Sequence, residues 1–167
     1  PSPHGPASTA AAVIAMSCRA PGHGVPACVQ VGEARGEMEF LATGTGPYAR
    51  LLDQVKTDWQ WWEPPGVSPI VYLDMLGVLD GSTMAVHCVH ATPSDRAVLV
   101  RTRTPICLCP RSNAQIEGAL PNVSALVDAG LLLALGSSSH ASAEDLDVLS
   151  EVRFLREKFP DIPTSRW

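Results

Sequence analysis

Short runs of apolar residues recur along the chain, and each run ends in a polar or glycine-containing segment. These runs cover residues 25–31, 84–89, 105–109 and 131–135. The longer segments between them space their apolar residues three or four positions apart, as on one face of an α-helix. The predicted helices cover residues 10–19, 37–44, 47–55, 69–76, 94–101, 122–129 and 145–158. Strands that alternate with helices in this way predict an α/β fold with a parallel sheet.

The central unit of this pattern is residues 83–113, which predict a strand, a helix and a second strand. Near-continuous apolar strands joined by a helix are typical of a βαβ unit in a sheet that is buried on both faces. A TIM-type (β/α)8 barrel closes with eight such strands. Four strands with their helices therefore predict half of a TIM-type barrel. Since no shift in composition marks an internal boundary, residues 1–167 are expected to form one partial barrel domain.

Composition narrows the range of partners. Hydrophobic residues make up 46% of the chain and charged residues 17%, and the net charge is -5. This acidic balance argues against a surface for nucleic acid or for an anionic membrane. No apolar run approaches the roughly 20 residues that span a bilayer, and residues 1–4 lack the basic start of a signal peptide. Because the five cysteines show no C-x-x-C spacing, we expect reduced thiols in a cytoplasmic protein.

Polar side chains that can carry out chemistry stand at or just after the apolar runs. They are Gln30 and Glu33, then His87 and His90, then Arg111 and Asn113, and finally Ser138 and His140, with His4 before them all. The carboxyl ends of parallel strands share one rim of the sheet, and sites are built there. We therefore expect the polar side chains after the second and third runs to be neighbours. A Glu and a His at one rim can perform acid–base chemistry without a metal.

Five short motifs, in this order, resemble those of the amidohydrolase superfamily. They are Ser2-Pro3-His4-Gly5-Pro6, Gln30-Val31-Gly32-Glu33, His87-Cys88-Val89-His90, Cys109-Pro110-Arg111-Ser112-Asn113 and Gly136-Ser137-Ser138-Ser139. The resemblance is to the aminohydrolases and chlorohydrolases that act on adenosine-like nucleosides, S-adenosylhomocysteine, aminofutalosine or triazine-like rings. It implies the C-terminal half of a barrel, strands 5–8 with their helices. It also implies a hydrolase of carbon–nitrogen bonds that binds a small purine-like substrate and uses zinc or iron.

The same resemblance implies roles for individual residues. Glu33 matches the family's proton-shuttling carboxylate, and His87 matches the histidine that polarises the leaving or attacking oxygen. These two are the candidate catalytic residues. His4, Glu33 and Asn113 are the candidates for substrate binding. The alternative is that these residues are inherited from an active ancestor and are idle here.

Two positions depart from the family's pattern. Gln30 stands where the family has a metal-binding histidine, and Ser138 stands where it has the metal-binding aspartate. The family's H-x-H pair is not present in this chain. A catalytic zinc needs about three protein ligands, and Gln and Ser are poor ones. We therefore expect no metal ligands and no cofactor in this chain.

Whether the chain is an enzyme stays open at this point. One interpretation is a degenerate or incomplete metal-dependent hydrolase. The other is a catalytically inactive fragment, or a binding or structural homologue, that another chain completes. Half a barrel leaves two open edges, and open edges favour association. Either interpretation therefore predicts a homo-oligomer or a complementary half-barrel as partner.

Two of the remaining features have more than one interpretation. The histidines after the second and fourth runs could form a new metal site, but His87 and His90 are an odd number of residues apart, which favours opposite faces of a straight strand. The tryptophans at positions 59, 61 and 62 line a lid over a substrate, pin a long connection to the barrel wall, or cover an interface with missing chain. Glu37 and Glu39 are expected on the solvated face of their helix.

Overall fold

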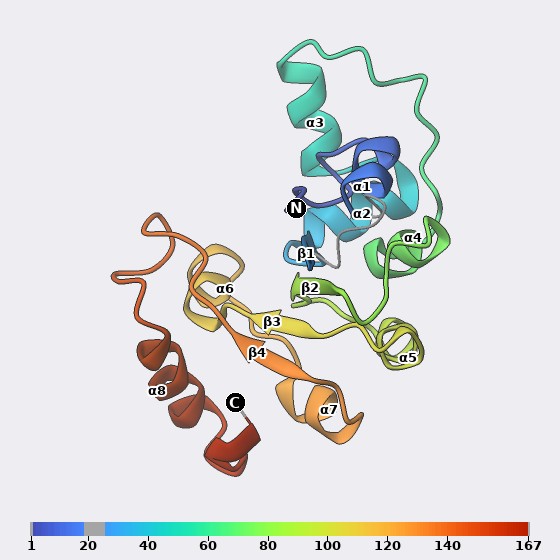
Figure 1. Cartoon of the computed structure of the whole chain (residues 1–167). Helices are drawn as coiled ribbons and strands as arrows, with labels where there is room; N and C mark the ends of the chain where they lie inside the picture. Colours follow the sequence, from blue (N-terminus) through green and yellow to red (C-terminus); the bar gives the residue numbers. More distant parts are fainter. Residues whose placement is uncertain (1, 19–25, 167) are drawn as a thin grey trace.

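The computed structural model describes residues 2–18 and 26–166, and its centre is a sheet of four parallel strands (Figure 1). The strands are β1 (Ala27–Val31), β2 (Thr83–His87), β3 (Ile106–Leu108) and β4 (Leu133–Leu135). Their order in the sheet is their order in the chain, and every neighbouring pair is parallel. The predicted parallel α/β fold is thereby confirmed, and β1 and β4 are the two outer strands of this sheet.

Helices connect the strands and cover the sheet, with α4, α5 and α7 along one side of it in Figure 1. They are α1 (Ala11–Cys18), α2 (Arg35–Thr43), α3 (Pro47–Gln54), α4 (Pro69–Met75), α5 (Pro93–Thr102), α6 (Pro110–Ile116), α7 (Val123–Asp128) and α8 (Val148–Lys158), with a 3-10 turn at Thr164–Arg166. In the described part of the chain, no helix has the length and apolar character that crossing a membrane requires.

The starts of these helices follow from local sequence. At α5, Thr92 and Asp95 form a capping box, in which the Asp95 N–H donates to Thr92 Oγ1 at 3.2 Å and the Thr92 N–H donates to the Asp95 carboxylate at 2.8 Å. At α7, Asn122 Oδ1 accepts the Ala125 N–H at 3.1 Å. Such caps satisfy backbone donors that have no partner within the helix.

No helix is predicted at residues 110–113, but these residues form the first turn of α6. Proline is favoured at the first position of a helix, where its fixed φ fits and its missing N–H costs nothing. Pro110 therefore starts this helix directly after β3. The predicted helix end at Arg19 and the predicted strand start at Val25 lie outside the described residues.

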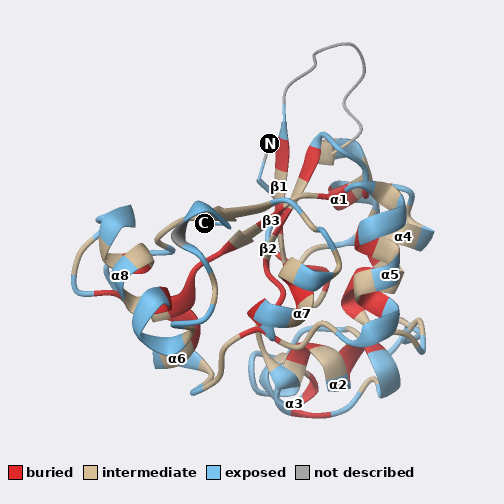
Figure 2. Ribbon diagram, turned by 90° about the horizontal axis from the view of Figure 1, so that it is seen from below, coloured by how far each residue is buried: buried red, intermediate tan, exposed pale blue. Residues whose placement is uncertain are grey.

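One face of the sheet is buried along β1, β2 and β3. Its side chains are Val29, Val31, Ala85, Ile106 and Leu108, and they form one core with Ile14, Ile70, Leu73, Leu99, Val123 and Leu126 from the helices. Figure 2 marks these buried positions in red. Each large aliphatic side chain buried in this way contributes about 1.5–3 kcal/mol to the free energy of unfolding. This core fixes the strand ends on which the candidate site is built.

The opposite face of the sheet is only half-buried. Gln30 pairs in register with Val86, Val86 with Cys107, and Cys107 with Ala134, so these four side chains form one row across all four strands. All four are intermediate in exposure, whereas their neighbours in β1 to β3 are buried. We call this row the inward row, since it occupies the face that points into the interior of a closed barrel.

Candidate functional site

Three of the predicted site residues converge at the carboxyl ends of the first three strands. His87 Nδ1 lies 3.3 Å from Glu33 Oε1, and Asn113 Nδ2 lies 2.9 Å from the same ring nitrogen. Asn113 Nδ2 also donates to Glu33 Oε1 at 3.3 Å. Glu33 follows β1, His87 ends β2 and Asn113 stands in the first turn of α6, after β3. We call these three residues the strand-end cluster.

The backbone at the end of β2 holds His87 in an unusual conformation. His87 has φ +78° and Cys88 has φ +52°, in the left-handed region that residues other than glycine rarely occupy. The turn is tied to β1, because the Cys88 N–H donates to Val31 O at 3.0 Å and the His90 N–H donates to Gly32 O at 3.0 Å. Non-glycine residues held in such conformations gather at functional sites. This backbone conformation at the end of β2 therefore directs the imidazole of His87 toward Glu33.

Burial shifts the cluster toward uncharged forms. The His87 side chain is 1% exposed, and its burial, together with the nearby charge of His4, lowers its pKa to about 4. Burial, followed by the repulsion of Glu117, raises the pKa of Glu33, although the Asn113 amide opposes this. Both shifts disfavour charge separation. Because the lowered pKa leaves His87 uncharged near neutral pH, its 3.3 Å contact with Glu33 is a contact with a neutral imidazole and not an ion pair.

A second carboxyl group, that of Glu37, forms a hydrogen bond with the backbone of the strand-end cluster. Its Oε2 accepts the Glu33 N–H at 3.1 Å, and the residue is 5% exposed. Burial raises its pKa to about 8, against the lowering effect of the Glu33 and Gly32 N–H groups. The prediction that Glu37 lies on a solvated face is thus wrong, while Glu39 is exposed as expected. Glu37 is the third residue of α2, where a Glu side chain can reach back to backbone N–H groups at the helix start, and this position was the signal in the sequence.

Two buried oxygen atoms of this site have no hydrogen-bond partner among the described residues. They are Glu37 Oε1 and Asn113 Oδ1. A buried polar atom without a partner costs about 1–3 kcal/mol. Asn113 Oδ1 is therefore a buried acceptor whose cost a hydrogen bond from a donor outside the described residues would relieve.

The segment that carries His4 crosses the end of β1. A Cβ atom on Gly5 would lie 2.7 Å from Gln30 O and 3.4 Å from Glu37 Oε1, so only glycine fits this approach. His4 itself is exposed, and its Nδ1 lies 2.5 Å from Ser8 Oγ. It acts on His87 through its charge, and its recorded side-chain hydrogen bond is to Ser8 rather than to the strand-end cluster.

His90 has a separate partner on the same rim. Its Nε2 lies 2.8 Å from Glu117 Oε2, and the same carboxylate oxygen accepts the Arg35 N–H at 3.1 Å. His90 therefore ties the turn after β2 to the end of α6. This pairing fits a hydrogen-bonded histidine better than a ligand of a new metal site.

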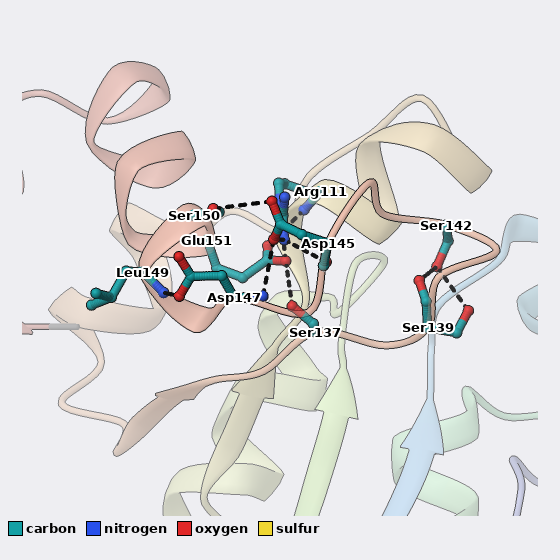
Figure 3. A network of polar contacts seen from close by, with 9 residues as sticks. All are labelled: Arg111, Ser137, Ser139, Ser142, Asp145, Asp147, Leu149, Ser150 and Glu151. Carbon is teal, nitrogen blue, oxygen red and sulfur yellow. Dashed lines mark hydrogen bonds and ion pairs between the residues drawn. The ribbon is translucent and has the colours of Figure 1, made fainter.

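Arg111 points away from the strand-end cluster, so the prediction that it is a neighbour of His87 is wrong. Figure 3 shows it between α8 and the loop after β4. Its Nε donates to Glu151 Oε1 at 2.9 Å and its Nη2 to Asp145 Oδ1 at 2.8 Å. Ser137 Oγ donates to the same Glu151 oxygen at 2.9 Å, and Glu151 is 0% exposed. The network fastens α8 to α6.

Gln30 and Ser138, which are predicted to stand at the family's metal positions, lie in different surroundings. Gln30 belongs to the half-buried inward row, and Ser138 and His140 are exposed in the loop after β4. Across residues 2–18 and 26–166, no group of three His, Cys, Asp or Glu side chains is placed to hold a metal ion. The donors in the described part of this chain therefore do not fit a zinc site by themselves.

A parallel strand–helix sheet with polar groups gathered at the carboxyl ends of its strands is the arrangement on which (β/α)8-barrel proteins build their sites. The chain belongs to the amidohydrolase family, whose model matches residues 1–161.

Curated relatives with similar sequences are deaminases. An aminodeoxyfutalosine deaminase of Deinococcus radiodurans is 36% identical over 172 residues, which is 96% of this chain and 40% of that protein. A 5-methylthioadenosine/S-adenosylhomocysteine deaminase of Pelotomaculum thermopropionicum is 38% identical over 125 residues, 75% of this chain and 24% of that protein. The chain thus spans two fifths or less of the length of these relatives.

Solved structures confirm the fold. Helicobacter pylori aminofutalosine deaminase, in complex with methylthio-coformycin, aligns with a TM-score of 0.73 at 19% identity, over 98% of this chain and 40% of that one. An atrazine chlorohydrolase from Arthrobacter aurescens, complexed with zinc, aligns with a TM-score of 0.72 at 16% identity, over 99% of this chain and 33% of that one. Together with the strand order, these matches confirm the prediction of half a TIM-type barrel.

Proposed function

We propose that residues 1–167 are the strand 5–8 half of an aminohydrolase barrel whose strand-end cluster binds a purine-like ring. The observation that carries this proposal is the convergence of Glu33, His87 and Asn113 within 3.3 Å of one another at three strand ends. The deaminase relatives, at 36% and 38% identity, support a purine-like ligand.

The chemistry of the cluster suits the edge of such a ring. A purine edge alternates hydrogen-bond donors and acceptors. The Glu33 carboxyl group, with its raised pKa, keeps its proton to higher pH and can donate it to a ring nitrogen. Asn113 Oδ1, which lacks a partner among the described residues, accepts from an amino group. In this proposal Glu33 and His87 are the proton-transfer pair, and His4 joins Glu33 and Asn113 in contacting the substrate.

The same proposal holds that the chain alone does not hydrolyse the ring. Gln30 and Ser138 replace the histidine and the aspartate of the resembled family, and neither side chain is a good metal ligand. The described His, Cys, Asp and Glu side chains do not make up a metal site by themselves. The proposed activity is ring binding by an incomplete active site.

A specific observation favours completion by another polypeptide segment. The inward row is half-buried along its whole length, and β1 and β4 each have one open edge in this sheet. Parallel sheets of this type are normally covered on both faces. The partner in this proposal is a complementary half-barrel, and a second copy of the chain is the alternative.

Titration calorimetry with 5'-methylthioadenosine tests the binding proposal. We expect measurable binding and no ammonia release. Glu33→Ala and Asn113→Ala each remove one hydrogen bond to the ring, which lowers affinity about tenfold. Glu157→Gln, an exposed carboxylate on α8, is the matched control and leaves affinity unchanged. Equal affinity in all four proteins would refute the assigned site, and ammonia release by the unmodified chain would refute its inactivity.

A further inference from the structure

A cavity of about 440 Å³ lies beside α2 and α3, outside the strand-end cluster. One wall is aromatic and consists of Phe40, Trp59, Trp61, Trp62 and Tyr72. The segment between residues 6 and 12 also lines the cavity, with small side chains that are mostly alanine. Cavities of roughly 300–1,000 Å³ are the size that binds small molecules. Aromatic rings together with small residues in the lining favour a flat ligand. We call this cavity the slot.

The aromatic wall is preorganised by its own contacts. The rings of Phe40 and Trp62 stack with centroids 4.7 Å apart and an interplanar angle of 14°. Trp59 also packs against Phe40, with ring centroids 5.7 Å apart and an interplanar angle of 55°. These contacts agree with the prediction that the tryptophans pin a long connection. They do not account for Trp61, whose side chain is 75% exposed.

The polar edges of the two outer indoles are already engaged. Trp59 Nε1 donates to Asp53 Oδ1 at 2.8 Å, and Trp61 Nε1 donates to Asp58 O at 2.9 Å. These bonds fix the orientation of both rings and leave their faces, rather than their N–H groups, for a ligand. Recognition in this slot therefore depends on stacking and on charge.

The formal charge in the described lining of the slot is negative. Asp58 is the one acidic residue of this lining, which includes no described Lys, Arg or His. The faces of aromatic rings are themselves negative and attract cations. An anionic ligand meets repulsion from both sources, whereas a positively charged ring gains from both.

We propose that this cavity is a binding site for a flat, positively charged heteroaromatic ring. The site is independent of the proposed purine site, since none of Glu33, His87 and Asn113 lines it. In this proposal the exposed ring face of Trp61 stacks on the ligand, and the carboxylate of Asp58 attracts the same ligand through its charge.

Three bicyclic probes of similar shape separate charge from shape: N-methylquinolinium, quinoline and quinoline-6-carboxylate, at about pH 7.5. Calorimetry gives the affinities, and tryptophan fluorescence reports the contact, because three of the four tryptophans of the chain line the cavity. We expect the cation to bind about tenfold more tightly than neutral quinoline, and the anion to bind least. Quinoline binding as tightly as the cation, or no binding of any probe, overturns the proposal.

Three variants complete the test. Asp58→Asn lowers the affinity for the cation about threefold and leaves that for quinoline unchanged. Trp61→Ala weakens both probes, and since Trp61 is mostly exposed the fold does not depend on it. Met75→Ala removes an equally exposed apolar side chain from α4, outside the cavity, and changes neither affinity. A loss of the same size in Met75→Ala, or an equal effect of Asp58→Asn on both probes, contradicts the assignment.

Discussion

Replacing Glu37 with glutamine tests whether a buried, protonated carboxyl group supports the candidate site. Glu37 is 5% exposed and holds the Glu33 N–H, and burial raises its pKa from 4.5 to about 8. A raised carboxyl pKa means that the folded state binds the proton more tightly than the unfolded state. The stabilising effect is therefore complete below pH 4.5 and is lost as the pH rises toward 8.

The size of the effect follows from one proton. Between the two pKa values the free energy of unfolding falls by about 1.4 kcal/mol per pH unit. His87 has the opposite influence, because its pKa is lowered from 6.5 to about 4 and stability therefore increases as the pH rises from 4 to 6.5. Above pH 6.5 this opposing effect ends. From pH 6.5 to 8 the loss of stability due to Glu37 is thus about 2 kcal/mol.

Urea unfolding at several pH values between 6.5 and 8 measures this loss. We expect the free energy of unfolding of the native chain to fall by about 2 kcal/mol over this window, and that of Glu37→Gln to stay level. Glu39→Gln is the matched control, because Glu39 is exposed two residues away on the same helix, and it should retain the fall. A native chain without any fall, or a Glu37→Gln variant with the full fall, would refute the burial argument.

Arg111→Met should lower the free energy of unfolding by about 3–5 kcal/mol, because it leaves the buried Glu151 without its cationic partner. The double variant with Glu151→Met should recover most of this loss in the same urea assay. A much smaller loss in Arg111→Met contradicts the importance of this network. Gln30→His with Ser138→Asp should release no ammonia from adenosine-like substrates, since two ligands fall short of about three; turnover by that variant alone shows that the metal position is misassigned. Sedimentation at micromolar concentration should show association through the open strand edges, and a stable compact monomer argues against it.

The strands were predictable because each is short, apolar and bounded by turns. The predicted run at 131–135 contains β4 at Leu133–Leu135, and the run at 105–109 contains β3 at Ile106–Leu108. Periodicity locates such elements but not their ends, since end residues are decided by backbone pairing. The convergence of Glu33 and His87 was also predictable, because parallel strands put their carboxyl ends at one rim.

The failures have tertiary causes. Helix α6 was missed because its first turn carries polar side chains, two of which, Ser112 and Asn113, are buried by contacts from elsewhere in the chain. Arg111 was misplaced because its partner Glu151 is 40 residues away in the chain. Glu37 was predicted to lie at the surface. A Glu in the first turn of a helix can, however, accept from a backbone N–H at the helix start, as Glu37 does from Glu33. Burial of charge depends on neighbours that a single sequence does not reveal.

The inward row limits what can fill the centre of the barrel. Layers of side chains fill a barrel interior, with bulky branched residues dominating, but this row supplies Val86, Cys107 and Ala134 beside the single long side chain of Gln30. A second copy of the chain would bring the same small volumes, and the unfilled space would cost about 1 kcal/mol for each methyl-sized void. Close packing therefore selects a partner whose facing side chains are large, so the shape of this face discriminates between a complementary half and a copy of itself.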